Sequence, residues 1–358
     1  MDDKIFLPKI FSVCEVFKFF MENRKIYPYL AFCVLCFTFG TSYALVSVIR
    51  QNVDPYLLSS LRMIFGCIAA LGIFLYKGMT SPNYFRHAKQ SLSSGSTPAI
   101  KSMVCGIINS GFPHSLITIA QRTVPSVAVQ ISQPCVSLFS LIFAAIFLSD
   151  ERFSFKQFSF QLLSLVGTVL VTIPTFSSDS DKGATLFDYS LLLIAIASFG
   201  FGAVYIKLFL PKADNVLLCF FQLLGSSIYT TVYSLFIHGL KGYLMNFFAI
   251  NFFTMFYIFC LGAFYTCTNS FLYVYIIREL GTVTANYTNV GQIVVGVIVG
   301  VLFLHEWKDY SLIDVLVSIA GLVVLSISIM LGLKQGKSGK NGSIDENDDE
   351  KVLLSSSL

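Results

Sequence analysis

Two pairs of amide side chains lie inside long apolar runs of this sequence. Gln130 and Gln133 are three residues apart and precede Pro134, and Asn286 and Asn289 have the same spacing. Residues three apart share one face of a helix, so each pair presents neighbouring hydrogen-bonding groups. In an apolar run that crosses lipid, a polar side chain normally faces protein or a water-filled cavity. These amides either bind a polar solute in a central cavity or join helices through hydrogen bonds.

Further polar residues interrupt other apolar runs. Tyr265 and Asn269 are four residues apart on one helical face. His114 has a reference pKa of about 6.5 and could exchange a proton; the alternative is a neutral imidazole bonded to a neighbouring helix. Arg62 costs free energy in lipid unless it is paired or reaches water, so it either binds an anion or forms a structural tie. The predicted solute-binding set is Gln130, Gln133, Asn269, Asn286, Asn289, Tyr265, His114 and Gln222, with Arg62 as a structural or anion-binding charge.

No motif of catalysis accompanies these residues. The sequence has no GxxxxGK[ST] phosphate-binding loop, and its Ser, His and Glu residues show no spacing typical of a triad or metal site. We therefore expect no enzyme activity, no cofactor and no metal. The net charge of +4 implies no nucleic-acid partner, because the basic residues flank predicted membrane helices.

The composition indicates a membrane protein. Of 358 residues, 55% are hydrophobic and only 12% are charged. A helix needs about 20 apolar residues to cross the hydrocarbon core of a bilayer. The sequence predicts ten such crossings, at approximately 28–48, 56–76, 101–120, 125–148, 155–174, 187–207, 214–237, 250–276, 281–304 and 311–333.

Lys and Arg are distributed unevenly between the loops. Most of them fall on one side of the predicted membrane, in the segment before residue 28 and in alternate loops such as 77–99. The positive-inside rule assigns that side to the cytosol, and an even number of crossings places both termini there.

The two halves of the chain carry similar patterns. The run ending in "FLSDER" (147–152) and the run ending in "FLHEW" (303–307) each precede another apolar segment, and Ala128 aligned with Ala285 sets Pro134 over Gly291. Each half contains five predicted crossings. Because five is odd, the second copy enters the membrane from the opposite side, and the halves are predicted to be inverted repeats, which are typical of secondary transporters.

Over about residues 28–333 the sequence resembles the EamA-type drug/metabolite transporters. The stretches "FTFGTSYALV" (37–46) and "LLSSLRMIFGCIAAL" (57–71) resemble the first-helix and second-helix motifs of that family. The stretch 263–307, "AFYTCTNSFLYVYIIRELGTVTANYTNVGQIVVGVIVGVLFLHEW", resembles the signature of its second repeat. The resemblance implies a ten-helix all-α fold and transport of a small organic solute such as an amino acid, another metabolite or a drug-like compound.

Two alternative functions remain open at this point. Related branches of the superfamily carry nucleotide sugars and sugar phosphates, and such an antiporter needs several basic residues around its site. A membrane scaffold or receptor that transports nothing is the second alternative, and it predicts that the polar helix faces are replaceable without loss of ligand binding.

The sequence divides into a cytosolic segment at 1–27, repeats at 28–176 and 186–333, and a polar tail at 334–358 that we expect to be disordered. "DEKVLL" (349–354) resembles an acidic dileucine signal, with Asp349, Leu353 and Leu354 as contacts for a clathrin adaptor. Localisation is therefore predicted at the plasma membrane or at an endosomal, lysosomal or vacuolar membrane. The fifth and tenth crossings have the least polar faces, which leaves them available for a homodimer contact.

Overall fold

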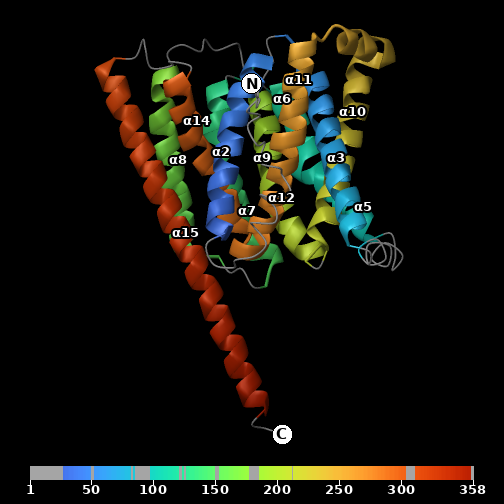
Figure 1. The fold of residues 1–358 in the computed structure, drawn as a ribbon. Coiled ribbons are helices and arrows are strands. Elements are labelled where there is room, and N and C mark those ends of the chain that lie inside the picture. Colours follow the sequence, from blue (N-terminus) through green and yellow to red (C-terminus); the bar gives the residue numbers. More distant parts are fainter. Residues whose placement is uncertain are drawn as a thin grey trace, which may run out of the picture.

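The computed structural model describes residues 27–49, 52–81, 84, 97–120, 123–124, 126–149, 153–176, 185–211, 213–303 and 311–355, and contains helices but no strand within them. Figure 1 shows a bundle of long helices that run roughly side by side. The helices are α2 (Tyr27–Ile49), α3 (Pro55–Thr80), α5 (Thr97–Gly106), η1 (Ile107–Gly111), α6 (Phe112–Ala120), α7 (Ser126–Phe147), α8 (Phe155–Phe176), α9 (Leu186–Phe209), α10 (Asn215–Phe248), α11 (Phe252–Cys260), η2 (Leu261–Thr266), α12 (Cys267–Leu280), α13 (Thr282–Asn286), α14 (Thr288–Phe303) and α15 (Leu312–Ser355).

Seven helical segments in the described part of the chain are long and apolar enough to cross a membrane. Two shorter apolar helices, Tyr27–Ser42 and Ile131–Phe147, lie beside them. The prediction of an all-α membrane protein is confirmed. The ninth predicted crossing is divided between α13 and α14 at Tyr287, which leaves α14 shorter than a full span.

Two crossings contain a short π-helical segment. In the first, η1 separates α5 from α6, and in the second, η2 separates α11 from α12. A π-helical turn adds a residue to the helix and rotates the side chains that follow it, and such turns are frequent at functional sites. His114 follows η1, and Thr266 ends η2.

Glycines set the closest approaches between helices. A Cβ atom at Gly262 of η2 would lie 2.6 Å from the Arg62 carbonyl oxygen of α3, and one at Gly106 of α5 would overlap the Gln222 carbonyl of α10. Small residues let helix backbones approach in membranes, where the hydrophobic effect does not drive helix association. The same kind of contact joins α2 to α14 at Gly40, α7 to α9 at Gly200, and α8 to α15 at Gly167 and Gly321.

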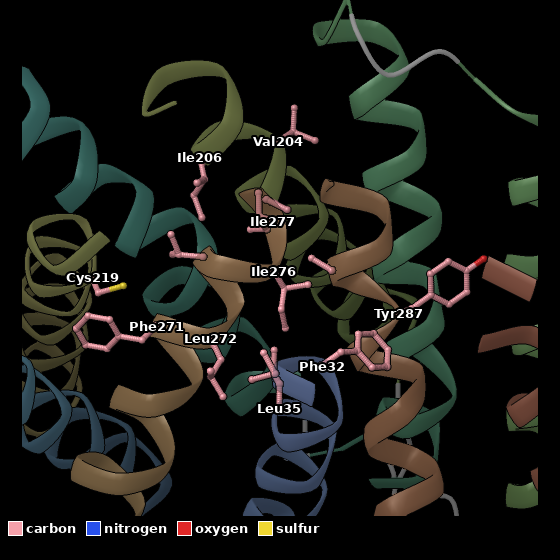
Figure 2. Close-up of a cluster of buried hydrophobic side chains, with 14 of the residues drawn as sticks. Phe32, Leu35, Val204, Ile206, Cys219, Phe271, Leu272, Ile276, Ile277 and Tyr287 are labelled. Carbon is pink, nitrogen blue, oxygen red and sulfur yellow. The ribbon is translucent and has the colours of Figure 1, made fainter. Parts of the chain in front are cut away.

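The two ends of the bundle differ in how apolar side chains pack. We name the ends after the aspartates that precede α3 and α10, Asp54 and Asp214. At the Asp214 end, the main core cluster joins the start of α2, the end of α9 and the end of α12. Figure 2 shows Leu272, Ile276 and Ile277 of α12 lying among side chains of α2 and α9.

At the Asp54 end, the buried apolar residues form two separate clusters. One cluster joins the end of α2, the start of α3 and the end of α11, and includes Ile49, Leu57 and Ile258. The other joins the end of α6 with α7 and the start of α9, and includes Ala120 and Val129. Within the described residues, the bundle is therefore closed by one continuous core at the Asp214 end and divided at the Asp54 end.

The last helix differs from the sequence prediction. We expected a disordered tail over 334–358, but α15 continues as one helix to Ser355 and projects beyond the other helices (Figure 1). No proline interrupts α15, and extension of a helix that has already formed fixes fewer dihedral angles per hydrogen bond than nucleation. The side chains of Asp349, Leu353 and Leu354 lie outside the described part, as do residues 1–26 of the predicted N-terminal segment.

Candidate functional site

The predicted glutamine of α7 faces a glutamine of α14. The Nε2 atom of Gln292 donates to the Oε1 atom of Gln133 at 3.5 Å, near the long limit for a hydrogen bond. Both side chains are buried. This contact links the two halves of the chain in the interior of the bundle. The side chain of Gln130 lies outside the described residues.

Asn269 of α12 lies against α2. Its Oδ1 atom accepts a short hydrogen bond from the Thr38 hydroxyl, which also donates to the Val34 carbonyl of its own helix. The Asn269 side chain is only 3% exposed, and no other described residue bonds its Nδ2 atom. A buried donor that stays unpaired costs about 1–3 kcal/mol, so an acceptor brought to this amide would be stabilising.

The two predicted asparagines that precede Gln292 form a short polar chain. The Asn286 Oδ1 atom accepts from the Tyr273 hydroxyl at 2.7 Å and from the Asn289 Nδ2 atom at 3.3 Å. Asn286 is fully buried, whereas Asn289 is partly exposed. Asn286 therefore positions Asn289, and Asn289 is the more exposed member of the pair.

Arg62 and His114 lie at a similar depth on different helices. The Nε atom of Arg62 donates to the Thr266 hydroxyl of η2 at 2.7 Å. His114 Nδ1 bonds the Ser110 carbonyl at 2.7 Å, and its ring meets Phe199 edge to face. Both residues lie about two turns from the Asp54 end of their helices.

Two other predicted residues lie in tightly packed surroundings. Tyr265 packs against the core cluster that contains Ile49 and Leu57. Gln222 is buried where α10 meets Gly106, and its Oε1 atom accepts no hydrogen bond from the part of the chain that the structure describes.

Sequence reasoning missed Thr38 and Thr266. A hydroxyl in a helix usually donates to a carbonyl of the preceding turn, so its presence in an apolar run does not indicate a contact with another helix. Both residues do make that local bond, yet each also contacts a predicted site residue of another helix. The only sequence clue was that Thr38 lies within the stretch 37–46 and Thr266 within 263–307, both of which resemble family motifs.

Polar residues also tie α3 and α10 together at both ends of the bundle. Asp54 caps the start of α3 and bonds His238 of α10 at 2.9 Å, while Asp214 caps the start of α10 and bonds Lys77 of α3 at 3.0 Å. Asp214 also accepts from the Tyr84 hydroxyl. Each aspartate therefore bonds a basic residue near the end of the other helix.

The Asp214 carboxylate depends on these neighbours for its charge. Burial raises its pKa, but hydrogen bonds from Tyr84, Lys77 and the Leu217 N–H outweigh that effect and hold the pKa below its usual value. Burial and the nearby negative charge of Asp214 raise the pKa of Tyr84 above its usual range. At neutral pH, an ionised Asp214 therefore accepts from a neutral tyrosine and a charged lysine.

The fold and the buried polar groups define the protein as a multi-pass helical membrane protein with hydrogen-bonding side chains in its interior. Residues 26–173 match the model of the EamA-like transporter family, in agreement with the drug/metabolite transporter superfamily. A solved crystal structure that is 16% identical has the same fold, with a TM-score of 0.59 over 85% of this chain and 97% of its own. No curated protein matches the sequence.

Proposed function

We propose that the protein is a secondary-active transporter that moves a small organic solute by alternating access between two inverted five-helix repeats, 28–176 and 186–333. The family match to the first half supports transport of a small solute. The observation that carries the proposal is the buried polar set between the halves, with Gln133 facing Gln292 and Asn269 bonded to Thr38.

Reciprocal contacts support the inverted repeat. The sequences "DPYLL" (54–58) and "DNVLL" (214–218) begin α3 and α10 in the same way, each with a capping aspartate. Gly262 approaches the Arg62 carbonyl as Gly106 approaches that of Gln222. Arg62 and Gln222 both lie eight residues after the capping aspartate of their helix. η1 and η2 likewise interrupt the third crossing of each half.

The unequal packing at the two ends supports alternating access. The continuous cluster at the Asp214 end blocks passage there, whereas the clusters at the Asp54 end are separate and leave the group of α2, α3 and α11 free to part from the group of α6, α7 and α9. The positive-inside rule assigns the Asp214 end to the cytosol, so the conformation corresponds to a carrier closed toward the cytosol. Both termini then lie in the cytosol.

The paired ties between α3 and α10 suggest the axis of the motion. Because Asp54–His238 and Lys77–Asp214 hold these two helices at both ends, α3 and α10 move as one unit. The helices that carry Gln133 and Asn289 then rock against this unit and expose the polar set to each side in turn.

A thermal-shift screen and uptake into proteoliposomes test the proposal. The purified protein is screened against amino acids, nucleobases, polyamines, nucleotide sugars, sugar phosphates and amphipathic drugs, because a ligand that binds the folded state raises the melting temperature. We expect one chemical class to respond and to be taken up. Gln133→Ala and Asn289→Ala should each weaken binding roughly fivefold, as expected for one lost hydrogen bond.

Gln157→Ala is the matched control, because Gln157 lies at the start of the peripheral helix α8. It should leave binding unchanged. A ligand that binds Gln133→Ala, Asn289→Ala and Gln157→Ala equally well would place the solute elsewhere. Binding without uptake of any solute would favour the scaffold or receptor instead.

A further inference from the structure

We propose that residues 240–248 form a separate helix that lies in the plane of the membrane on the Asp54 side, at the boundary between lipid headgroups and acyl chains. The partner of this surface is the lipid bilayer. This membrane contact is independent of the transport function, because it follows from the backbone turn at Gly239 and from the exposed apolar face after that turn.

The backbone of α10 turns at Gly239. The φ of 67° and ψ of 166° of this residue are not helical, and a positive φ of this size favours glycine. A Cβ atom added at Gly239 would have no neighbour within 4 Å, so the backbone conformation, and not a close contact, favours glycine there. Figure 1 shows the last part of α10 at an angle to the rest of the helix, lying across the Asp54 end of the bundle.

The part of α10 before Gly239 is already long enough to cross a bilayer. It extends about 36 Å, because each helical residue adds about 1.5 Å, whereas the hydrocarbon core is about 30 Å thick. Its last residue, His238, bonds Asp54 at 2.9 Å at the end of the bundle. The next crossing starts with α11 at Phe252. Residues 240–248 therefore lie at the membrane surface, between two crossings.

One face of this short helix packs against the protein. Tyr243 and Phe247 contact the core cluster that contains Ile49 and Leu57. The Tyr243 hydroxyl also forms a hydrogen bond of 3.2 Å with the Ser60 hydroxyl of α3. Residues four apart share one face of a helix, so these contacts fix which side of the helix points away from the protein.

The opposite face is apolar and exposed. It carries Leu240, Leu244, Met245 and Phe248, which are 66%, 43%, 63% and 78% exposed. Lys241 lies on the same face. A lysine at the membrane surface places its apolar stem beside acyl chains and its ammonium group among the headgroups. This combination suits the boundary of a bilayer better than water, where the four apolar side chains would be hydrated.

Lipid is the partner that the neighbouring surface predicts. The exposed apolar surface continues onto the crossings before and after this helix, through Phe236 of α10 and through Phe252, Phe253 and Phe256 of α11. Side chains on the outer faces of crossing helices contact acyl chains. A helix in the membrane plane buries its apolar face about 5–10 Å into the boundary between headgroups and acyl chains. The exposed face of residues 240–248 is therefore continuous with the lipid-facing surface.

Quenching of tryptophan fluorescence by brominated lipids tests the position of the helix. Trp307→Phe removes the only tryptophan of the chain, and Met245→Trp or Phe248→Trp then adds one on the exposed face. Each protein is reconstituted into phosphatidylcholine vesicles that carry bromine either near the headgroup or near the end of the acyl chain. We expect bromine near the headgroup to quench both tryptophans at least about twofold more strongly than bromine near the chain end.

Ile228→Trp and Phe247→Trp are the controls in the same background. Ile228 is 48% exposed and lies near the middle of the crossing part of α10, so bromine near the chain end should quench Ile228→Trp more strongly. Phe247 faces the protein, so either lipid should quench Phe247→Trp less than Met245→Trp. The exposed face is tested at two positions, so the loss of one variant through misfolding leaves the other.

Three results would overturn the in-plane helix. Quenching of Met245→Trp and Phe248→Trp by iodide, present on both sides of the membrane, but by neither lipid would place the segment in water, as expected for one straight helix to Phe248. Quenching by neither iodide nor lipid would show that a protein surface, such as a second copy of the chain, covers this face. Stronger quenching by bromine near the chain end would place the segment within the acyl chains. Solute uptake is measured separately and is unaffected by which of these results is obtained.

Discussion

Gly106→Val is expected to remove nearly all folded protein. A Cβ atom at this position would lie 1.8 Å from the carbonyl oxygen of Gln222, and one at the facing Gly225 would lie 2.3 Å from the carbonyl oxygen of Met103. Because the obstructing atoms belong to backbone in the middle of α10, no side-chain rotation relieves the overlap. Overpacking typically costs about 1–3 kcal/mol, and we expect at least the upper end of that range, since α5 and α10 must separate.

The measurement is the yield of monodisperse protein by size-exclusion chromatography in detergent, with the melting temperature of whatever remains. Gly72→Ala is the matched control: Gly72 lies in α3 with no neighbouring atom within 4 Å of an added Cβ. Alanine there should be neutral or slightly stabilising, by up to about 1 kcal/mol, because it lowers the entropy of the unfolded chain. A normal yield and melting temperature for Gly106→Val would contradict the close contact between α5 and α10.

Asp214→Ala is expected to lower the stability by about 2–3 kcal/mol. The substitution removes the N-cap of α10, where Asp214 accepts from the Val216 and Leu217 N–H groups at 3.0 and 3.1 Å. It also removes the acceptor for Lys77 and Tyr84, which connect α10 to the end of α3. The Lys77 ion pair is partly exposed, so we assign it less than about 1 kcal/mol and the cap the larger share.

The effect of Asp214→Ala should depend on pH with a defined sign. The pKa of Asp214 is lower in the folded protein than in the unfolded chain, so its contribution is fully present above the unfolded pKa of about 4 and disappears as the pH falls through the folded pKa. Melting temperatures of the wild type and the variant should therefore differ at pH 7 and converge below about pH 4.

Asp314→Ala is the control for Asp214→Ala. Within the described part of the chain, Asp314 makes local capping hydrogen bonds with Ser311 alone, and it is partly exposed at the start of α15. It should cost about 1 kcal/mol or less. Equal losses for the two variants would show that Asp214 acts as a helix cap alone and that its contacts with Lys77 and Tyr84 add nothing.

Composition and periodicity were sufficient to predict a helical membrane protein and most of its elements. Apolar runs of membrane length can be satisfied in lipid by helices, so the crossings followed from residue type alone. The positions of α3, α9 and α10 agree with the predicted runs to within a few residues at their starts. Hydropathy along the sequence did not distinguish the π-helical segments η1 and η2, because their composition matches that of the flanking α-helices.

For the candidate site, the sequence identified which polar residues are costly in lipid but not their partners. It singled out Gln133, Asn269 and Arg62 because each interrupts an apolar run. It did not predict that Arg62 would meet Thr266, or that Asn269 would bond Thr38 and keep a donor that no other described residue bonds. The number of positions between two residues of a helix predicts whether they lie on the same face. It does not predict which neighbouring helix that face contacts.

The sequence by itself therefore determined that this protein lies in a lipid bilayer, the class of its fold and its family resemblance. The first two depend on the free energy of placing each residue type in lipid or water. The tertiary structure alone decided the reciprocal ties of Asp54 to His238 and of Asp214 to Lys77, and the closure of one end of the bundle by a continuous core. Those features join residues more than a hundred positions apart. Their geometry depends on how the helix backbones pack, including the glycine contacts of η2 with α3 and of α5 with α10, and only the assembled bundle brings these backbones together.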